Sequence, residues 1–469
     1  MNIRVTTELI RAALPSARFL GELPCSFDSV VLSLSEAKPG ALWVYLGSAN
    51  EQSIQMCRAV SFNGGIVFAS SEHMVSGAHG VYVDKPVSAL QALAFYKRRR
   101  IFGDFIAILG GNGKTTVTQM LGSILRGTGQ SSRYHLTAGN QNNHIGVPLT
   151  LLNVPYGPTT TTAKFRCVIE IGMNHIGEVL PLAHMVSPTI ALVNNAQREH
   201  LANLGSVKLT AIENGSVFRA VQYGGIAIYP SGDLFTPYWN RMARGLKKVR
   251  FSATGRAAVF GQRDKSGAFS IWQNSHLIRF RNPLLVGLHN VHNAVAAATV
   301  AMSTGIDHEQ IRLGLESFIP PKGRLTHYSI SHTDGCMILV DDTYNANPDS
   351  VEAALSLVAT YAGKKLLIFG DMAECISPAE THRLVGEYAK RLGFHAVWSV
   401  GKFSRWSGLA FEKNSYHFEN LSDAIASVSR LRGYDAILVK ASRFMKLELL
   451  VEAIREDLAQ SCSDRRAGA

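Results

Sequence analysis

The sequence predicts an α/β protein of three domains, with mostly parallel sheets in the central and C-terminal ones. At 469 residues the chain is long enough for about three domains of ordinary size. Between residues 101 and 320, apolar strand-like segments alternate with helical ones, which is the pattern of a mostly parallel sheet. The alternation starts again beyond residue 321. We therefore expect domains at 1–100, 101–320 and 321–469.

The first domain is expected to be a small α/β unit. One helix and four strands are expected there, at residues 7–13, 29–34, 41–46, 65–69 and 80–83. The turn Lys38-Pro39-Gly40 separates the first two strands. An apolar helix at 89–96 then ends in Lys97-Arg98-Arg99-Arg100, and cations suit a helix C-terminus. We expect this basic run to be a solvated linker.

The other two domains each repeat strands and helices. In the central domain we expect strands at 167–171, 188–194 and 224–229, helices at 206–221 and 290–304, and antiparallel strands within 251–280. In the C-terminal domain we expect strands at 337–341, 365–369, 396–400 and 436–440, and helices near 349–361, 380–392, 420–430 and 445–457. The last pattern is Rossmann-like, but no glycine-rich fingerprint follows its first strand, so a dinucleotide site is not expected there. Residues 461–469 are expected to fray.

The most informative stretch is an apolar strand that runs into a glycine-rich turn, Gly110-Gly111-Asn112-Gly113, followed by Lys114-Thr115-Thr116. The next residues give a helix one apolar face, at Val117, Met120, Leu121, Ile124 and Leu125. Glycines let several backbone N–H groups converge, and the helix dipole and Lys114 add positive charge. Such a loop holds a polyphosphate and places a Thr hydroxyl at Mg²⁺. The usual pattern has Gly at position 108, where this chain has Ile, so an ordinary glycine turn is the alternative.

Composition narrows the function classes. With 46% apolar and 17% charged residues, the chain is expected to be a soluble globular protein with a large core. It has neither a membrane-length apolar run nor a secretory signal pattern, and its six cysteines are scattered, so a cytoplasmic protein is expected. The formal charge is +12, but the basic residues are dispersed. We therefore expect no nucleic-acid partner, and a nucleic-acid-stimulated ATPase is a minority alternative.

Polar residues gather in three further places. Glu170 ends a predicted strand next to the phosphate loop, where an acid can hold Mg²⁺, and His200 follows the next strand. Residues 137–148 are rich in amides, which can orient phosphoryl or carboxylate oxygens, or form Asx turns. Residues 341–350 leave a strand, and their Asp and Asn side chains suit ribose, metal or substrate. Asp349 is expected to cap the following helix.

Taken in order, these segments resemble the motifs of the Mur ligase family. The motifs are Gly-Gly-Asn-Gly-Lys-Thr-Thr, Asn-Asn-His-Ile-Gly-Val-Pro, Val-Ile-Glu-Ile-Gly-Met-Asn-His, Gly-Leu-His-Asn-Val-His-Asn-Ala, Lys-Gly-Arg-Leu, Asp-Asp-Thr-Tyr-Asn-Ala-Asn-Pro-Asp-Ser, Phe-Gly-Asp-Met-Ala-Glu and Val-Lys-Ala-Ser-Arg. They span about 107–446, and their combination is specific. Within the family they look most like the branch that adds D-alanyl-D-alanine to a muropeptide.

The resemblance implies a cytoplasmic, ADP-forming, three-domain ligase of cell-wall biosynthesis that uses ATP and Mg²⁺. A substrate carboxylate attacks the γ-phosphate of ATP to give an acyl phosphate, and an amine then displaces phosphate. The partners implied are a small carboxylate and an amino acid or dipeptide, without nucleic acid or a membrane span, and a monomer is expected. Positioning and charge neutralisation supply most of such catalysis.

The resemblance also implies roles for individual residues. It implies ATP-binding roles for Gly110, Asn112, Gly113, Lys114, Thr115, Thr116, Asn290, Asn293, Arg324 and Asp342. It implies metal-binding roles for Thr115, Glu170 and His200. It implies substrate contacts for Asn142, Asn143, Asn345, Asn347, Ser442 and Arg443. It implies catalytic positions at Lys114, Glu170, His200 and Asn214.

Position 214 departs from the family. The family places a carbamylated, metal-binding lysine fourteen residues after the metal-binding histidine, and here that position is Asn214. An asparagine cannot form a carbamate and brings no negative charge. Either the second metal binds more weakly, or Glu213 or water takes the place of the carbamate. We expect an activity that is independent of bicarbonate and needs more Mg²⁺ than a lysine-bearing relative.

Other departures concern substrate recognition. The Asp-Ser-Arg that helps the family hold uridine diphosphate is Ser33-Leu34-Ser35 here, and the loop after it is 47–52, Gly-Ser-Ala-Asn-Glu-Gln. The acid usual before Ile-Gly-Val-Pro is His144, and the threonine that opens the phosphate loop is Leu109. Two alternatives therefore stand beside the wall enzyme. One is a ligase diverted to a substrate outside the cell wall, and the other is a nucleotide-binding paralogue without turnover.

Overall fold

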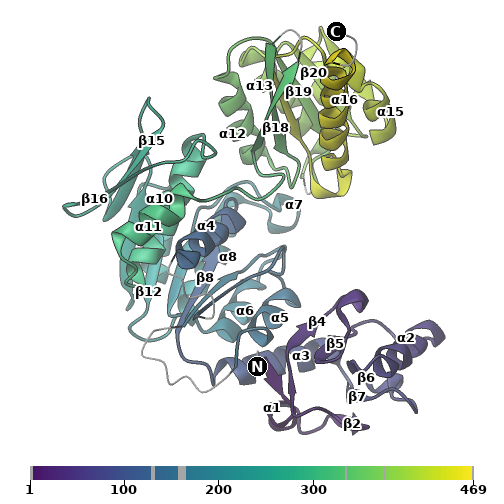
Figure 1. Cartoon of the computed structure of the whole chain (residues 1–469). Coiled ribbons are helices and arrows are strands. Elements are labelled where there is room, and N and C mark those ends of the chain that lie inside the picture. The colour runs from purple at the N-terminus through teal and green to yellow at the C-terminus, as the bar shows by residue number, and fades with distance from the viewer. Residues whose placement is uncertain (1–3, 128–132, 157–164, 333–334, 374, 467–469) are drawn as a thin grey trace.

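The computed structural model describes residues 4–127, 133–156, 165–332, 335–373 and 375–466. It contains three large sheets, of five, nine and six strands, and one two-stranded sheet. The three large sheets follow one another along the chain, from the N-terminal unit through the central unit to the C-terminal unit (Figure 1). The three-domain α/β architecture expected from the sequence is confirmed. The domain limits at 1–100, 101–320 and 321–469 stay a prediction.

The N-terminal unit is a five-stranded sheet in the order β2-β7-β6-β5-β4, and β1 and β3 form the two-stranded sheet. Its helices are α1 (Thr7–Ala13), α2 (Glu51–Phe62) and α3 (Pro86–Arg98). Its strands are β1 (Val5–Thr6), β2 (Arg18–Leu20), β3 (Ser26–Phe27), β4 (Ser29–Val31), β5 (Ala41–Val44), β6 (Ile66–Ser70) and β7 (Gly80–Val83). The strand expected at 29–34 is shorter, because the chain turns into a 3-10 helix at Leu34–Glu36. Helix α2 was not expected; a capping box between Asn50 and Ser53 starts it.

The basic run at the end of α3 was expected to be a solvated linker, and this is wrong for its first half. Arg99 and Arg100 are exposed, but Lys97 and Arg98 are the last, buried residues of α3. Lys97 is fully buried, and its Nζ donates to the carbonyl oxygens of Leu152 and Val154, both at 2.6 Å. Arg98 donates to the carbonyls of Val186 and Ser187 and lies over the ring of Phe105. These carbonyls end two helices of the central unit, where cations are favourable. The two cations therefore fasten the N-terminal unit to the central one.

The central unit is a nine-stranded sheet in the order β16-β15-β14-β13-β12-β11-β8-β10-β9. The first six strands along the chain are β8 (Asp104–Leu109), β9 (Tyr134–Leu136), β10 (Arg166–Glu170), β11 (Ile190–Val193), β12 (Ile226–Pro230) and β13 (Lys247–Ser252). The last three are β14 (Val259–Arg263), β15 (Ala268–Gln273) and β16 (His276–Arg281). β15 pairs antiparallel with both of its neighbours, as expected for residues 251–280, and the other pairs are parallel.

Helices cover both faces of this sheet. They are α4 (Lys114–Arg126), α5 (Gly146–Leu152), α6 (Val179–Val186), α7 (Leu201–Leu204), α8 (Val207–Gly215), α9 (Thr236–Met242), α10 (Leu288–Ser303) and α11 (His308–Glu316). The helix expected at 206–221 is α8 followed by a 3-10 helix at Ser216–Ala220. In β8, Ile106 and Ile108 pack with α4 and α10, while Phe105, Ala107 and Leu109 pack with α5 and α6. The alternation of β8 therefore buries both faces and fixes the phosphate loop at its end.

The C-terminal unit is a six-stranded sheet in the order β17-β18-β22-β19-β20-β21, parallel except for β17. Its strands are β17 (Thr326–His332), β18 (Gly335–Asp342), β19 (Lys365–Gly370), β20 (Ala396–Val400), β21 (Ser415–Phe418) and β22 (Ala436–Lys440). Its helices are α12 (Pro348–Ala359), α13 (Pro378–Arg391), α14 (Arg405–Phe411), α15 (Leu421–Ala426) and α16 (Glu448–Arg466). Helix α16 continues through residues 461–466, which were expected to fray; 467–469 lie outside the described residues.

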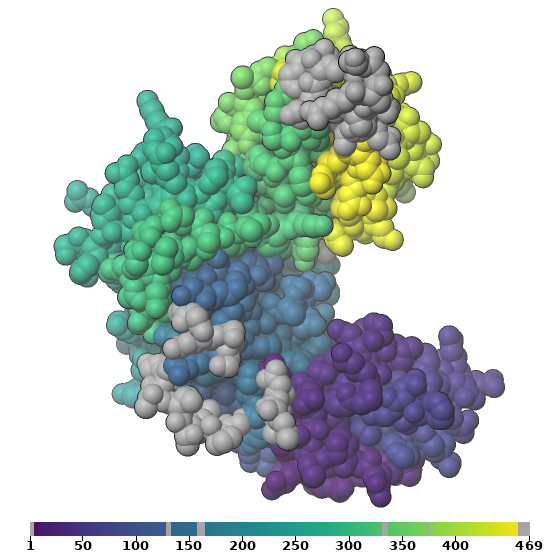
Figure 2. Space-filling view, in the orientation of Figure 1, coloured from purple at the N-terminus to yellow at the C-terminus, as the bar shows by residue number. Residues whose placement is uncertain are grey.

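The surface is hollowed on one side, between the N-terminal and C-terminal units (Figure 2). The central unit forms the back of this hollow. None of the helices within the described ranges combines the length and apolar character needed to cross a membrane.

Candidate active site

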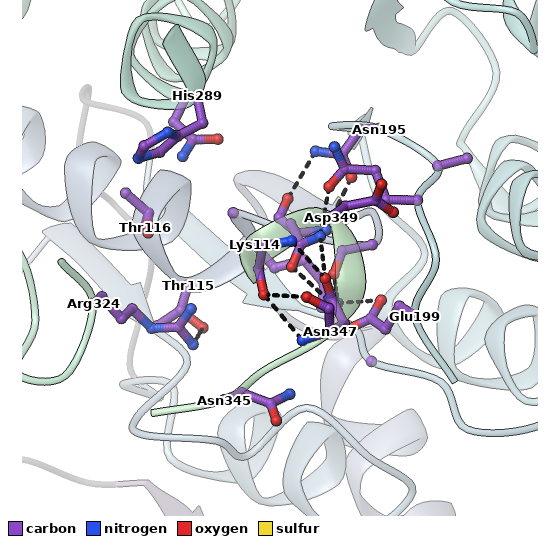
Figure 3. A pocket seen from close by; sticks show the side chains of 18 of the residues that line it. Lys114, Thr115, Thr116, Asn195, Glu199, His289, Arg324, Asn345, Asn347 and Asp349 are labelled. Carbon is purple, nitrogen blue, oxygen red and sulfur yellow. Dashed lines mark hydrogen bonds and ion pairs between the residues drawn. The ribbon is translucent and has the colours of Figure 1, made fainter. Parts of the chain in front are cut away.

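A large cavity lies where the central unit meets the C-terminal unit. Its volume is about 1830 Å³, and its lining comes from the phosphate loop, the ends of β10 and β11, the start of α10 and the segments around 323–325, 342–350 and 440–444 (Figure 3). In parallel sheets, ligands bind beyond the carboxyl ends of the strands. The cavity takes this position on both sheets.

The phosphate loop has the backbone that the sequence predicts. Gly110 and Gly113 have φ of 135° and 83°, which favour glycine. A Cβ on Gly113 would lie 2.3 Å from Oδ1 of Asn293, so this position accepts no side chain. Helix α4 begins at Lys114 directly afterwards, so its unpaired N–H groups point at the same place.

Asparagines after β11 support this loop, and sequence reasoning missed them. Asn195 accepts a hydrogen bond from the backbone N–H of Asn112 through Oδ1, at 2.9 Å. Asn194 donates to the carbonyl of Asn112, at 2.9 Å, and to Oδ1 of Asn293, at 3.0 Å. The Asn-Asn pair at the end of a buried strand is a sequence signal for such a role, because amides can bind backbone without adding charge.

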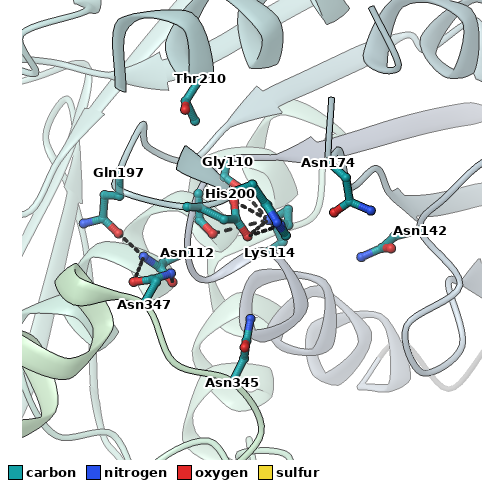
Figure 4. A network of polar contacts seen from close by, with 12 residues as sticks. Gly110, Asn112, Lys114, Asn142, Asn174, Gln197, His200, Thr210, Asn345 and Asn347 are labelled. Atoms are coloured by element: carbon teal, nitrogen blue, oxygen red, sulfur yellow. Dashed lines mark hydrogen bonds and ion pairs between the residues drawn. The ribbon is translucent and has the colours of Figure 1, made fainter. Parts of the chain in front are cut away.

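Lys114 is held by its own loop and by a carboxylate. Its Nζ donates to the carbonyl of Gly110 at 2.6 Å and lies 2.9 Å and 3.1 Å from the two carboxylate oxygens of Glu199. Both side chains are nearly buried, with 12% and 10% exposed. Glu199 was not singled out from the sequence, because a glutamate between an arginine and a histidine has no local signal. Figure 4 shows Lys114 beside Gly110 and His200.

Glu170 lies where a cation could bind. One of its oxygens accepts from Nδ2 of Asn142, at 2.8 Å, and the other, Oε2, is buried without a hydrogen-bond partner. His200 lines the same cavity, with its Nε2 3.6 Å from Oε1 of Glu199. Among the described residues no three His, Cys, Asp or Glu side chains lie together as a preformed metal site. Mg²⁺ at phosphate sites is commonly held by one or two protein ligands together with phosphate oxygens.

The C-terminal unit contributes cations and amides to the cavity. Arg324 donates to the Thr115 hydroxyl, at 2.9 Å, and its guanidinium lies 4.0 Å from the centre of the Tyr344 ring. Asp342 is paired with the buried Lys440, at 2.5 Å, and Lys440 also donates to the carbonyl of Asn345. Sequence reasoning named Arg324, Asp342 and Asn345 but missed Lys440. A lysine at the end of a predicted strand gives no sign of which carboxylate it will pair with.

The cap of α12 differs from the expectation. Asn347, not Asp349, caps this helix, in a reciprocal capping box with Ser350. The Asn347 amide also exchanges hydrogen bonds with the Asn112 amide of the phosphate loop, at 2.8 Å and 3.3 Å. Asp349 instead accepts three hydrogen bonds from Arg198 of the central unit. The two residues therefore join the C-terminal unit to the central one close to Lys114 (Figure 3).

The remaining predicted residues lie around the same cavity. Thr116, Asn143, Asn290, Asn293, Ser442 and Arg443 all line it. Asn143 Oδ1 accepts from the backbone N–H groups of Ile145 and Gly146, and Asn290 donates to the carbonyl of Val286. Two unpredicted histidines of α10, His289 and His292, line it as well, and burial lowers the pKa of His289 to about 4. A neutral imidazole is therefore expected there at neutral pH.

Asn214 is the exception among the predicted catalytic residues, because it does not line the cavity. It is buried behind the loop, where its Oδ1 accepts from the N–H of Gly110 at 3.0 Å and its Nδ2 donates to the carbonyl of Thr210. Glu213 does not line the cavity either, and its Oε1 accepts from the N–H of Val179, at the start of α6. The hypothesis that Glu213 replaces a carbamate is therefore not supported by its position.

Comparisons with known proteins agree with this geometry. Residues 108–301 match the Mur ligase middle domain, and residues 323–443 match the Mur ligase glutamate ligase domain. The UDP-N-acetylmuramoyl-tripeptide–D-alanyl-D-alanine ligase of Escherichia coli K12 is 32% identical over 449 residues, covering 92% of this chain and 94% of the relative. The chain belongs to the Mur ligase family.

Solved structures place this Mur ligase beside MurF. A crystal structure of MurF from Acinetobacter baumannii aligns over 97% of this chain and all of its own, with a TM-score of 0.82 and 26% identity. MurF from Thermotoga maritima, solved in complex with ADP, covers 92% of this chain and 98% of its own, with a TM-score of 0.73 and 20% identity, and so shows the shared fold. The protein is a MurF-like, ATP-dependent ligase.

Proposed function

We propose that this Mur ligase joins D-alanyl-D-alanine to the terminal carboxylate of a UDP-N-acetylmuramoyl tripeptide and splits ATP into ADP and phosphate. The observation that carries the proposal is the single cavity shared by the phosphate loop and the amide-rich segment of the C-terminal unit. The coverage supports it as well, because the similarity to the Escherichia coli relative named for this reaction extends over 94% of that relative.

The cavity suits a reaction that depends on positioning and charge. The loop N–H groups and Lys114 neutralise the phosphates while the carboxylate attacks the γ-phosphorus. ADP leaves, and the resulting acyl phosphate lies between the central and C-terminal units. The amine of the dipeptide then attacks the acyl carbon, phosphate leaves with the bonding pair, and a proton is released from the new amide nitrogen. Asn345 and Arg443, which line the C-terminal side, are proposed to face the dipeptide.

We propose that Mg²⁺ assists at the phosphate end. The buried, unpartnered Oε2 of Glu170 suits a cation, and Thr115 and His200 lie in the same lining. Bound there, Mg²⁺ would neutralise charge on the phosphate oxygens. We further propose that the protein acts in the cytoplasm as a monomer. Its domains are proposed to span residues 1–100, 101–320 and 321–469.

A panel of carboxylate substrates tests the proposal. ADP release would be measured with D-alanyl-D-alanine and ATP, together with either the UDP-muramoyl tripeptide or the same tripeptide without its UDP group. We expect ADP and a ligated product with the UDP-linked substrate, and much less with the other. No release with any carboxylate would contradict turnover.

A second outcome would favour a ligase diverted from the wall. In the N-terminal unit, Ser33 and Ser35 hydrogen-bond each other through their hydroxyls at an exposed site, where the family uses a charged segment for uridine diphosphate. Equal rates with and without the UDP group would show that the nucleotide part is not recognised. Such a result would support an ADP-forming carboxylate–amine ligase but would contradict the UDP-muramoyl tripeptide as its specific substrate.

A further inference from the structure

Glu199 is a buried carboxylate placed inside a site for anions. Its residue is 8% exposed, and both of its oxygens contact the ammonium of Lys114. Lys114 completes its hydrogen bonds with carbonyl oxygens of Gly110 and Gly111. In this arrangement Glu199 gives Lys114 the negative partner that a phosphate would otherwise supply.

The turn that carries Glu199 is held in place from two sides. His200 has a φ of 51°, a left-handed conformation that costs a non-glycine residue about 1–2 kcal/mol. The N–H of Glu199 donates to the carbonyl of Gln197, at 2.8 Å. Arg198, just before it, donates from its backbone and its guanidinium to Asp349 of the C-terminal unit. A strained turn fixed by both units indicates that the position of Glu199 has a function.

Nucleotide binding changes the charge balance of this turn. When phosphates take the ammonium of Lys114, Glu199 becomes a buried carboxylate next to a polyanion. An uncompensated buried charge is strongly unfavourable. A divalent cation would remove this penalty, and Oε1 of Glu199 is 3.6 Å from Nε2 of His200 in the cavity that also contains the unpartnered Oε2 of Glu170.

Neither the other carboxylate of this segment nor position 214 can supply a negative charge to such a cation. Between β11 and the end of α8 the acidic residues are Glu199 and Glu213, and Glu213 is outside the cavity, bonded to the backbone of Val179. Asn214 is uncharged and bonded to the backbone of Gly110. Glu199 is therefore the carboxylate of this segment that reaches the phosphate end.

We propose that Glu199 changes partners during the reaction. It holds Lys114 in the nucleotide-free protein, and it turns to the divalent cation when phosphates take the lysine. Glu199 thereby makes the binding of nucleotide and of Mg²⁺ depend on each other. The inference rests on the Mg²⁺ role proposed above, and it adds Glu199 to the residues proposed to lie near that cation.

The test measures ADP affinity with and without Mg²⁺. The dissociation constant of ADP would be measured by calorimetry in EDTA and in excess Mg²⁺, for the full-length protein and for Glu199→Gln. Without Mg²⁺ we expect Glu199→Gln to bind ADP several-fold more tightly, because the competitor of the phosphates has lost its charge. The gain in affinity from Mg²⁺ should shrink about tenfold in the variant. A Mn²⁺ titration at saturating ADP, followed by paramagnetic resonance, should show weaker cation binding.

Glu213→Gln is the matched control, because Glu213 is a buried carboxylate on α8 that lies outside the cavity. It should leave the Mg²⁺ gain unchanged. If Glu199→Gln tightens ADP equally with and without Mg²⁺, Glu199 only restrains Lys114 and the partner change is wrong. Unchanged or uniformly weaker affinity would also overturn it, as a purely structural role. Failure of the wild-type protein to gain affinity from Mg²⁺ would instead contradict the proposed Mg²⁺ role.

Discussion

At the scale of single residues, the site is built from amides and a few buried charges. Asn112, Asn194 and Asn195 hold the phosphate loop by side-chain and backbone hydrogen bonds, while Lys114 and Glu199 supply the charge at its centre. Neutral amides fix a loop without competing for its anionic ligand, because they add no net charge. We therefore expect substitutions of the supporting amides to change mainly stability, and substitutions of the charged residues to change mainly nucleotide binding.

The first prediction concerns loop support by Asn214. Asn214→Ala leaves the N–H of Gly110 buried without its acceptor, which should lower the free energy of unfolding by about 1–3 kcal/mol. Urea unfolding measures this change. Gln222→Ala is the control, because it removes an exposed amide that bonds the carbonyl of Ser187, and about 0.5 kcal/mol or less is expected. Equal losses in the two variants would show that Asn214 does not support the loop.

The second prediction concerns the missing carbamate. Since an asparagine at position 214 cannot react with carbon dioxide, the rate of ADP release should be the same in carbon-dioxide-free buffer and in added bicarbonate. Initial rates at a fixed Mg²⁺ concentration would measure this. A several-fold stimulation by bicarbonate would mean that a lysine elsewhere is carbamylated.

Much of the residue scale could be predicted, and the limits have a physical cause. Motif order singled out Lys114, Glu170, Arg324 and Asn345, and all four line one cavity, while their roles stay predictions. Glu199 and Lys440 were missed because their partners are remote in sequence, so their role exists only after folding. The cap of α12 was assigned to Asp349, but Asn347 provides it. Either residue type can cap a helix, and Asp349 instead pairs with Arg198 of the central unit.

At the scale of elements, helix termini provide several of the connections between the units. The end of α3 delivers Lys97 to the last carbonyls around α5 and Arg98 to those around α6. The start of α12 contacts the phosphate loop. Strands with short, apolar sequences were predicted closely, as for β7, β20 and β22. Lys97 and Arg98 were misjudged as solvated because local charge does not show which carbonyls lie near a helix end.

The third prediction uses Lys97. Burial lowers the pKa of Lys97 well below its usual 10.5, so the unfolded chain binds more protons than the folded one between the two pKa values. The free energy of unfolding should then rise with pH towards about 10.4, the pKa of an unperturbed lysine. Lys97→Met should lose this part of the rise, as measured by urea unfolding at neutral and alkaline pH.

The control for this experiment is Lys247→Met, at an exposed site. It should keep the pH dependence of the wild-type protein. A Lys97→Met variant whose stability varies with pH like that of the wild type would show that Lys97 titrates normally despite its burial.

At the scale of the whole molecule, the C-terminal unit closes the cavity over the central one. Among the described residues, the contacts that join them include Arg198 with Asp349, Asn112 with Asn347, and Arg324 with Thr115. The alternation of strands and helices predicted three units correctly. It could not predict which strand ends face each other, because that depends on side chains 151 to 235 positions apart.

The fourth prediction concerns these contacts. Asp349→Ala should loosen the two units and increase the maximum dimension in small-angle scattering, because Asp349 accepts three hydrogen bonds from Arg198. Glu352→Ala is the control on the same helix, since Glu352 is half exposed and accepts one bond from Arg198. Exposed ion pairs contribute about 0–1 kcal/mol, so Glu352→Ala should change the maximum dimension little. Identical scattering of both variants and the wild type would contradict the role of Asp349.

The most direct test measures the amounts of ADP and of ligated product, in the wild-type protein and in Lys114→Ala. With ATP, Mg²⁺, the UDP-muramoyl tripeptide and D-alanyl-D-alanine, the account predicts one ADP per product by chromatography and mass spectrometry. Both should fall together, by at least about a hundredfold, when Lys114 is removed, since it supplies the charge that the phosphates need. Product formation that survives the loss of Lys114 would contradict the account.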